Sequence, residues 1–374
     1  MKKIQMVDLS SQYQRLKHEI DPRIQSIMEQ GYFIQGPSVK LLEEELQEFL
    51  QVKHVIGVGN GTDALQLAFM ALDLQPGDEV IIPSFAYAAL PEVLLLLNLK
   101  PVFVDVTAAT FCLDVTQIEQ KITKKTKAIA PVHLFGGVAE MDSIIQIAKK
   151  YGLFVIEDAA QSIGAQYCSG ATYGFAGCLG DIGTTSFFPS KNLGCYGDGG
   201  AVFTNSDLLA EKVRKLANHG QSKKYFHDIV GVNSRLDTIQ AEILRVKLSK
   251  LVEYNQIRND LADQYISGLS GIDDLILPSK STHSTHVFHQ FTLRVKGKFA
   301  TREQFRHYLT NQGIPSMVYY PLPLHKQIAY LQDVQLKVSE QLCEDVISLP
   351  ICPELTHENQ EYVINNIRQY FKKN

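Results

Sequence analysis

One lysine is placed where it could do covalent chemistry. From Thr184 to Gly194, a β-rich stretch leads through Pro189 and Ser190 into Lys191, which is surrounded by small and apolar residues. Burial in such surroundings lowers the pKa of an amine, and a neutral amine can form a Schiff base with an aldehyde. A lysine on the surface would be only a solvated charge. The setting therefore favours Lys191 as a group that binds an aldehyde.

Acidic residues close a second apolar run, Phe154 to Ile156. Glu157 and Asp158 would end a buried strand, and ligands in open α/β sheets bind at the carboxyl ends of strands. A carboxylate there could bind a metal ion, a ribose or a protonated ring nitrogen, although capping a helix is a simpler role. No further cluster of carboxylates or histidines lies nearby in the sequence, so no metal site is predicted.

A third segment, Gly57 to Thr62, is rich in glycine and lies between a predicted strand and a predicted helix. Glycines let the backbone approach a ligand closely, and the first N–H groups of the helix favour an anion such as phosphate. The glycine spacing is not that of a dinucleotide fingerprint, and no Gly-Lys-Ser/Thr follows as in a P-loop. A tight turn without a ligand is the alternative.

These three segments together are the parts that pyridoxal 5'-phosphate (PLP) requires. An aspartate keeps the pyridine nitrogen protonated so that the ring can serve as an electron sink. A lysine holds the aldehyde, and a helix N-terminus holds the phosphate. The sequence therefore predicts PLP as the cofactor, with Asp158 and Lys191 in these roles.

The elements that position these segments follow from the hydrophobic pattern between residues 38 and about 205. Short β-rich runs alternate with helical patterns, and the runs are apolar almost throughout, as in strands buried on both faces. This predicts an α/β fold with a mainly parallel sheet covered by helices. The predicted strands are Val55–Val58, Glu79–Pro83, Pro101–Val104, Lys127–Val132, Leu153–Glu157, Thr184–Phe188 and Gly200–Phe203. The predicted helices are Val39–Leu50, Thr62–Leu72, Thr116–Ile122, Asp142–Tyr151 and Ser206–Asn218. Capping patterns predict helix starts at Thr116 (with Glu119), Ser206 and Thr301 (with Gln304).

The pattern changes after about residue 234. One long helical periodicity covers Leu236–Leu269, β-like runs follow at His286–Val295 and Pro315–Tyr320, and a last helix is expected over Glu358–Phe371. We therefore expect a large PLP-binding α/β domain of residues 1–245 and a small C-terminal α+β domain of residues 246–374.

Composition excludes several classes of protein. The 374 residues are 45% hydrophobic and 20% charged, and 36 Lys and Arg against 40 Asp and Glu give a net charge of −4. This balance argues against nucleic-acid or membrane-surface binding. Apolar runs such as Val93–Leu97 are too short for a membrane span, and the N-terminal residues lack the apolar region of a secretory signal. The six cysteines match no zinc pattern, so we expect reduced thiols in a cytoplasmic protein.

Motifs along nearly the whole chain resemble those of the DegT/StrS family of sugar-nucleotide aminotransferases. The motifs that carry the resemblance are Val7–Leu9, Asn60–Leu65, Gly77–Val80, Glu157–Gln161, Ser186–Lys191, Gly197–Gly200, Gly231–Arg235 and Tyr320–His325. The resemblance implies a fold type I, aspartate-aminotransferase-like architecture. It also implies that Lys191 is the catalytic lysine that binds the cofactor aldehyde and that Asp158 binds the pyridine nitrogen.

The resemblance assigns further site residues. It places Gln161 at the ring hydroxyl, and Tyr87 as an aromatic ring stacked on the cofactor. Asn233 would reach the phosphate from the neighbouring subunit, which implies a homodimer with shared active sites. The residues implied to bind the phosphate are Gly61, Thr62 and Ser186, and those implied to bind the substrate are Arg235, Tyr319, Tyr320 and His325.

Several of these residues have simpler alternatives. Tyr87 could be a core aromatic, Arg235 could form a surface ion pair, and Tyr319 and His325 could be structural parts of a Pro-rich segment. The histidines 283, 286 and 289 are expected to be incidental, because residues 286 and 289 would point to opposite faces of a strand. His219 and Gly220 are expected to end a helix.

The implied reaction is a ping-pong transamination from an amino acid, with L-glutamate as the expected donor, to a nucleotide-linked keto-sugar. The sequences of Phe187–Gly200 and His219–Gln221 are similar to those of enzymes that aminate C3 of UDP-2-acetamido-3-keto sugars, including the glucuronate. This implies a role in surface-polysaccharide or lipopolysaccharide (O-antigen) biosynthesis. A dTDP-3-keto-6-deoxy-hexose 3-aminotransferase is the alternative, and C4 amination is a weaker one. Lys191 argues against a PLP-dependent dehydratase, which has histidine there. A non-catalytic PLP-binding regulator and a nicotinamide dehydrogenase are further alternatives.

Overall fold

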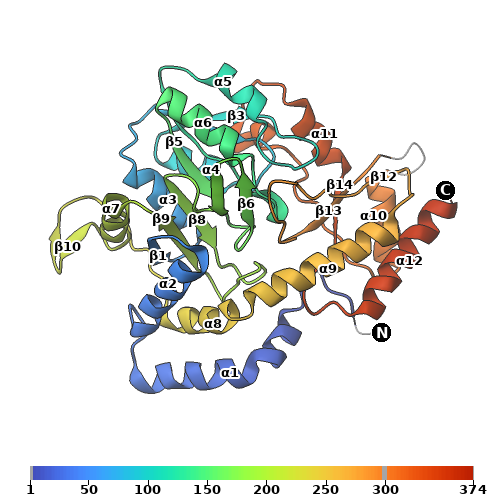
Figure 1. Cartoon of the computed structure of the whole chain (residues 1–374), viewed down its shortest axis with the longest axis horizontal. Helices are drawn as coiled ribbons and strands as arrows, with labels where there is room; N and C mark the ends of the chain where they lie inside the picture. Colours follow the sequence, from blue (N-terminus) through green and yellow to red (C-terminus); the bar gives the residue numbers. More distant parts are fainter. Residues whose placement is uncertain (1–2, 297–300, 374) are drawn as a thin grey trace.

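A seven-stranded sheet forms the centre of the larger part of the molecule (Figure 1). The computed structural model describes residues 3–296 and 301–373, so the first two residues of the N-terminal segment lie outside it. The strand order is β1-β9-β8-β5-β4-β2-β3, and β9 runs antiparallel to its two neighbours while the other adjacent pairs are parallel. The mainly parallel sheet is therefore confirmed. Its strands are β1 (His54–Val58), β2 (Glu79–Pro83), β3 (Lys100–Val104), β4 (Thr126–Ile129), β5 (Phe154–Asp158), β8 (Ile182–Ser186) and β9 (Gly200–Thr204).

Helices cover both faces of this sheet, which explains why its strands are apolar throughout. In β2, Val80 and Ile82 face one side and Ile81 the other, and the side chains of all three are fully buried. The first side packs against α3 (Gly61–Ala71), α4 (Ala89–Leu96) and α7 (Asp207–Ala217). The second packs against α5 (Ile118–Lys121) and α6 (Met141–Tyr151), and near β1 and β9 against α2 (Pro37–Leu50) and α8 (Thr238–Leu248).

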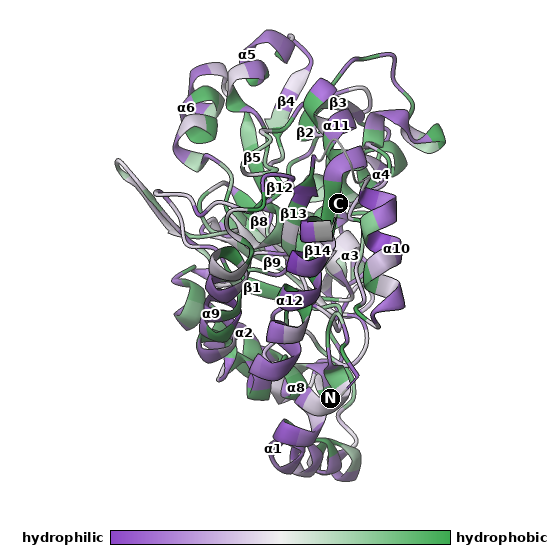
Figure 2. Cartoon of the chain, turned by 90° about the vertical axis from the view of Figure 1, so that its right-hand side faces the viewer, coloured by the Kyte–Doolittle hydropathy of each residue, from purple (hydrophilic) through white to green (hydrophobic). Residues whose placement is uncertain are grey.

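A smaller antiparallel sheet forms a second core. Its strands are β12 (Leu275–Ile276), β13 (Phe291–Val295) and β14 (Val346–Leu349), in that spatial order. It packs with α9 (Leu251–Leu269), α10 (Arg302–Asn311) and α12 (His357–Lys373). In Figure 2 the central strands are mostly hydrophobic in colour, whereas the outward turns of α10 and α12 are hydrophilic. The boundary at residues 245 and 246 falls within α8 and stays a prediction.

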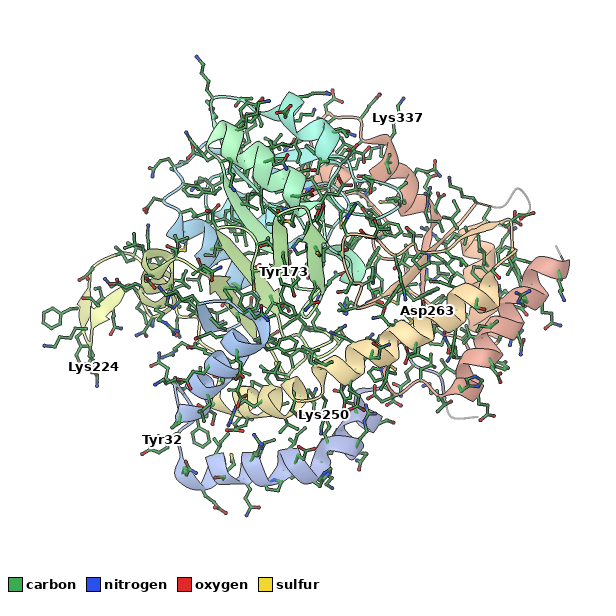
Figure 3. The ribbon with its side chains drawn as sticks, in the orientation of Figure 1. Tyr32, Tyr173, Lys224, Lys250, Asp263 and Lys337 are labelled. Carbon is green, nitrogen blue, oxygen red and sulfur yellow. The ribbon has the colours of Figure 1, made fainter. Side chains whose placement is uncertain are left out.

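Further elements lie at the periphery. The helix α1 (Leu9–Gln30) packs against α8, and α11 (Lys337–Asp345) packs against β13. A hairpin of β10 (Gln221–Lys223) and β11 (Phe226–His227) projects from the molecule, with Lys224 at its tip (Figures 1 and 3). A second hairpin is formed by β6 (Gln166–Ser169) and β7 (Thr172–Phe175). The 3-10 turns are η1 (Val115–Gln117), η2 (Leu134–Gly136), η3 (Leu324–Lys326) and η4 (Ile328–Tyr330).

The predicted helix Leu236–Leu269 is wrong, because it is two helices. The helix α8 ends at Leu248, and Ser249 and Lys250 separate it from α9; Lys250 is labelled in Figure 3. The hydroxyl of Ser249 donates to the carbonyl of Val246 at 2.8 Å. A serine that bonds a carbonyl of the preceding turn competes with the helical ladder, so the apolar pattern continues on both sides of a break.

Three smaller predictions also need correction. Only residues 291–295 of the predicted strand His286–Val295 form a strand, because Phe288 adopts a positive φ of 41°. Pro315–Tyr320 forms no strand beyond one isolated bridge at Met317. The turn at Thr116 is capped by Asp114, whose carboxylate accepts from the Thr116 N–H at 3.0 Å. The predicted caps at Ser206 and Thr301 are confirmed, the latter as a full capping box.

No helix of the described residues has the length and apolar character needed to cross a membrane.

Candidate active site

Lys191 lies in the turn between β8 and β9. Its backbone N–H donates to the carbonyl of Phe188 at 2.8 Å, and the Cys195 N–H donates to the carbonyl of Phe187 at the same distance. The side chain is half-buried. Burial lowers the pKa of the Lys191 amine to about 8, and the attraction of Asp158 offsets part of this effect. Roughly one amine in ten is therefore neutral at pH 7, far more than for an ordinary lysine.

Asp158 ends β5 and is paired in register with Thr184 of the parallel strand β8. Because parallel strands end at the same edge of the sheet, this pairing brings Asp158 close to the turn that carries Lys191. One carboxylate oxygen of Asp158 accepts from the N–H of Ala160 at 3.0 Å. Burial raises the pKa of the Asp158 carboxyl, while Lys191 and His133 counteract this shift.

The buried pair of Glu157 and His133 fixes the end of β5, next to Asp158. Both side chains are fully buried, and the carboxylate of Glu157 lies 2.8 Å from Nε2 of His133. The N–H of Ala139 donates to Nδ1 of His133 at 3.1 Å, so Nε2 carries the hydrogen and donates to Glu157. Three backbone N–H groups of residues 177–180 also donate to Glu157. His133 carries no signal in the sequence that marks it as a site residue, because no motif shows what its ring contacts.

The predicted phosphate site is the N-terminus of α3. Asn60 caps this helix by accepting from the N–H of Asp63 at 2.8 Å, so Gly61 and Thr62 form its first turn. Ser186, the last residue of β8, lies directly beside Gly61: a Cβ on Gly61 would stand 2.7 Å from Cβ of Ser186. The structure therefore brings together the three predicted phosphate ligands, and the close approach explains the glycine.

Gln161 connects the site to its aromatic wall. Its carbonyl oxygen accepts from the N–H of Phe135 at 2.8 Å, and its amide donates to the hydroxyl of Tyr320 at 3.1 Å. The ring of Tyr320 has its centroid 5.8 Å from that of Phe85 and 6.5 Å from that of Tyr87. The side chain of Tyr87 is 64% exposed, so the alternative of a core aromatic does not hold.

Tyr319 lies beside Tyr320, with ring centroids 6.2 Å apart. Burial raises the pKa of the Tyr319 hydroxyl, and a hydrogen bond with Gln290 opposes the shift. The two tyrosines are therefore neighbours, and their role in lining the substrate site stays a prediction.

His325 does not line an open site. Its side chain is fully buried, and Nδ1 lies 2.6 Å from the hydroxyl of Ser84, at the end of β2. Nε2 lies 3.3 Å from a carboxylate oxygen of Glu340 in α11. Burial lowers the pKa of the His325 ring. The expected contact with substrate is therefore corrected to the structural alternative: His325 fastens the segment after Tyr320 to the sheet.

Asn233 and Arg235 lie in the loop before α8, on either side of Ser234. The intervening Ser234 accepts from the N–H of Gly59 at 2.9 Å and donates to Asp63 at 2.6 Å, which fixes this loop against α3. Asn233 is exposed. Arg235 lines a cavity of about 480 Å³ between α2, α7 and β1, and none of the predicted cofactor residues lines it.

These residues fit PLP. The Asp158 carboxylate has one backbone donor and a raised pKa, and a protonated ring nitrogen would stabilise its charge. Lys191 supplies an amine of lowered pKa, and the first turn of α3 supplies N–H donors for a phosphate. Within residues 3–296 and 301–373, no group of three or more His, Cys, Asp or Glu side chains could hold a metal ion.

Known proteins similar to this chain include several enzymes. A model of the DegT/DnrJ/EryC1/StrS aminotransferase family matches residues 14–368. The chain is 45% identical to a UDP-2-acetamido-2-deoxy-3-oxo-D-glucuronate aminotransferase of Pseudomonas aeruginosa, over 94% of this chain and 96% of that protein. It is 44% identical to a pleiotropic regulatory protein of Geobacillus stearothermophilus, over 99% of both. It is 42% identical to a dTDP-3-amino-3,6-dideoxy-alpha-D-galactopyranose transaminase of Aneurinibacillus thermoaerophilus, over 98% of this chain and 99% of that protein.

Solved structures share the fold. A DegT/DnrJ/EryC1/StrS aminotransferase from Brucella abortus superimposes with a TM-score of 0.93 at 38% identity, over 98% of this chain and 99% of that chain. NtdA from Bacillus subtilis, solved with bound PMP cofactor, has a TM-score of 0.86 at 34% identity, over 95% of this chain and 82% of that chain. The predicted fold class is therefore confirmed.

Proposed function

Because this chain belongs to the DegT/DnrJ/EryC1/StrS aminotransferase family and is a PLP-dependent aminotransferase, we propose that it aminates the C3 ketone of a UDP-2-acetamido-3-keto sugar of the glucuronate type. L-Glutamate is the amino donor in this proposal. The 45% identity to the Pseudomonas aeruginosa enzyme named for that reaction supports the choice of sugar.

One observation carries the proposal: an amine of lowered pKa and a half-buried carboxylate of raised pKa lie at one edge of the sheet, beside a helix N-terminus. Lys191, Asp158 and the first turn of α3 come from three separate segments of sequence. PLP, when bound, supplies the electron sink for a carbanion at Cα of the amino acid. No single motif supports this chemistry as specifically as the combination does.

Each residue then has a task that its surroundings allow. Lys191 Nζ, which is partly neutral near pH 8, would take the proton that leaves Cα of the amino donor and hold it on the amine. Asp158 would keep a proton on the ring nitrogen of the bound cofactor, and the Glu157–His133 pair keeps the strand end that carries Asp158 in place. Gly61, Thr62 and Ser186 would hold the phosphate at the first turn of α3, and Gln161 would contact the ring hydroxyl. Tyr87 would stack on the cofactor ring, and Tyr319 and Tyr320 beside it would line the sugar-nucleotide site.

We also propose a homodimer with shared active sites. Asn233 is exposed, and Arg235 lines a cavity that contains none of the predicted cofactor residues of its own chain, which supports a role for both at the site of a second copy. A guanidinium suits the diphosphate or the sugar carboxylate of the substrate. In this proposal the enzyme works in the cytoplasm and its product enters surface-polysaccharide or lipopolysaccharide biosynthesis.

A dTDP-3-keto-6-deoxy-hexose is the second candidate substrate. It is supported by the 42% identity to the dTDP-sugar transaminase of Aneurinibacillus thermoaerophilus. The 44% identity to the pleiotropic regulatory protein makes a regulatory role one possible outcome of the test. However, the chain retains Lys191, which a purely regulatory role would not need.

The test begins with absorbance spectra of the purified holoenzyme before and after addition of L-glutamate. We expect glutamate to replace the visible band of the bound cofactor with the band of its amino form. UDP-linked and dTDP-linked 3-keto sugars are then added separately, and we expect the UDP sugar to restore the visible band faster.

Two variants make this test specific. Lys191→Ala should abolish turnover, whereas Lys149→Ala, which removes an exposed lysine of α6, should not change it. Faster return of the band with the dTDP sugar would favour the second candidate. A spectrum that ignores glutamate and every keto sugar would refute the aminotransferase proposal in favour of regulation.

A further inference from the structure

Asn192, the residue that follows Lys191, is buried and bonded on every polar atom of its side chain. Its amide nitrogen donates to the side-chain oxygen of Asn255 at 2.8 Å and to the backbone carbonyl of Val287 at 2.9 Å. Its side-chain oxygen lies 3.3 Å from Nδ1 of His289. The turn that carries Lys191 is thus tied to α9 and to the segment before β13.

These contacts fix how the two side chains are oriented. A backbone carbonyl can only accept, so the amide nitrogen of Asn192 must face Val287 and its oxygen must face His289. His289 must therefore donate through Nδ1–H. Nε2 of His289, which lies 3.4 Å from the side-chain amide of Gln290, is then an acceptor. The ring is neutral in this arrangement.

The same network reaches the other predicted cofactor residues. Asn255 also donates to the carbonyl of Ile163, in the turn that follows Gln161. Gln290 bonds to Tyr319, and its N–H donates to the carbonyl of Phe135. The expectation that His289 is incidental depends on a strand that would point His286 and His289 to opposite faces, but residues 286–290 form no strand.

We propose that His289, acting through Asn192, is a positioning residue that orients Lys191 toward Asp158. This inference deepens the proposed aminotransferase function and rests on it. The ring donates to the side chain next to Lys191, so the turn cannot rotate without leaving a buried acceptor unpaired.

The charges around His289 are consistent with an uncharged ring beside the lysine. Burial, together with Lys191 from the β8–β9 turn and Arg258 from α9, holds the pKa of His289 well below its usual value. The pKa of Lys191 itself is lowered by its burial and raised by the charge of Asp158 of β5. A neutral positioning group supports the lysine without adding a positive charge that would repel its ammonium form.

The test compares three variants as holoenzymes. His289→Phe keeps the ring volume but cannot donate to Asn192, whereas His289→Gln retains an N–H donor. Thr292→Val is the matched control, since Thr292 is 2% exposed and its hydroxyl bonds Ser348 at 2.8 Å without contacting the Lys191 turn. Each variant is measured for its melting temperature, kcat, KM and the pH midpoint at which the visible band of the bound cofactor changes.

We expect His289→Phe to lower kcat by at least about tenfold with KM changed less than about twofold, because the defect lies in the alignment of the lysine and not in substrate binding. Its band midpoint should shift by roughly half a pH unit or more. His289→Gln should restore both quantities to near wild type. Thr292→Val should lower the melting temperature while leaving kcat and the midpoint unchanged.

An unchanged midpoint and kcat in His289→Phe would overturn the inference, as would an equal change in Thr292→Val. If His289→Phe does not fold, Asn192→Ser takes its place with the same expectations, because serine is too short to reach His289. Failure of the proposed function is seen separately, as a wild-type enzyme that does not respond to glutamate or keto sugars.

Discussion

The lowered pKa of Lys191 predicts how fast the apoenzyme captures its cofactor at different pH values. Only a neutral amine can attack the cofactor aldehyde. With a pKa of about 8, roughly one amine in ten is neutral at pH 7, against about one in three thousand for an ordinary lysine at 10.5. Burial therefore increases the reactive fraction by about 300-fold at this pH.

The sign of the pH dependence follows directly. The rate of PLP capture by apoenzyme should rise with pH, with a midpoint near 8, and become constant above it. Because Asp158 raises the pKa of Lys191, the Asp158→Asn variant should move this midpoint to lower pH. The variant should thus capture PLP faster than wild type at pH 7 while turning over more slowly, since it no longer holds a proton on the ring nitrogen.

Stopped-flow absorbance of apoenzyme mixed with PLP over a pH series measures both midpoints. Glu157→Gln is a useful comparison, because it removes a neighbouring carboxylate that contacts His133 and not Lys191. A midpoint near 10 in wild type, or a shift to higher pH in Asp158→Asn, would refute the reasoning.

Two further predictions follow from close contacts. Gly61→Ala should weaken PLP binding by about tenfold, or roughly 1.4 kcal/mol, because the added methyl group would stand 2.7 Å from Cβ of Ser186. Titration of the apoenzyme with PLP measures the Kd, and an unchanged Kd would contradict this prediction. Asp345→Ala should lower the free energy of unfolding, measured in urea, by about 3–5 kcal/mol. The side chain of Arg294 is 8% exposed and bonds Asp345 at 2.9 Å, so the substitution leaves a buried charge without its partner. A loss below about 1 kcal/mol would show that solvent reaches the site.

The sequence predicted the parts of the fold that depend on local pattern. The seven apolar runs became the seven strands of the main sheet, since a strand buried on both faces is recognisable by its composition. Lys191, Asp158 and the turn at Gly61 could be selected because their residue types are unusual for their positions. Their closeness in space follows from the rule that ligands lie at the carboxyl ends of strands.

The rest depended on contacts between residues far apart in the sequence. His325 lies in a Pro-rich motif that suggests a site residue. Its contact with the hydroxyl of Ser84, which is 241 positions away in the sequence, shows that it is a buried structural residue. His289 was set aside because a strand was expected where Phe288 instead takes a left-handed conformation. The break at Ser249 is accompanied by a hydrogen bond from its hydroxyl to the carbonyl of Val246, which no hydrophobic pattern reveals.

The helix α9 bears on how the molecule can move. It begins beside the main sheet and runs to the smaller one (Figure 1), and Arg258 near its middle donates to the carbonyls of Phe288 and Ile351 at 3.1 and 2.8 Å. Together with Asn255, it joins α9 to both parts of the chain through buried bonds. A hinge motion of the smaller sheet would have to break several of these bonds at once, so the molecule is stiff along this axis. Substrate entry and product release are then left to the surface loops around Tyr87 and Tyr319, where side chains can rearrange without opening a core.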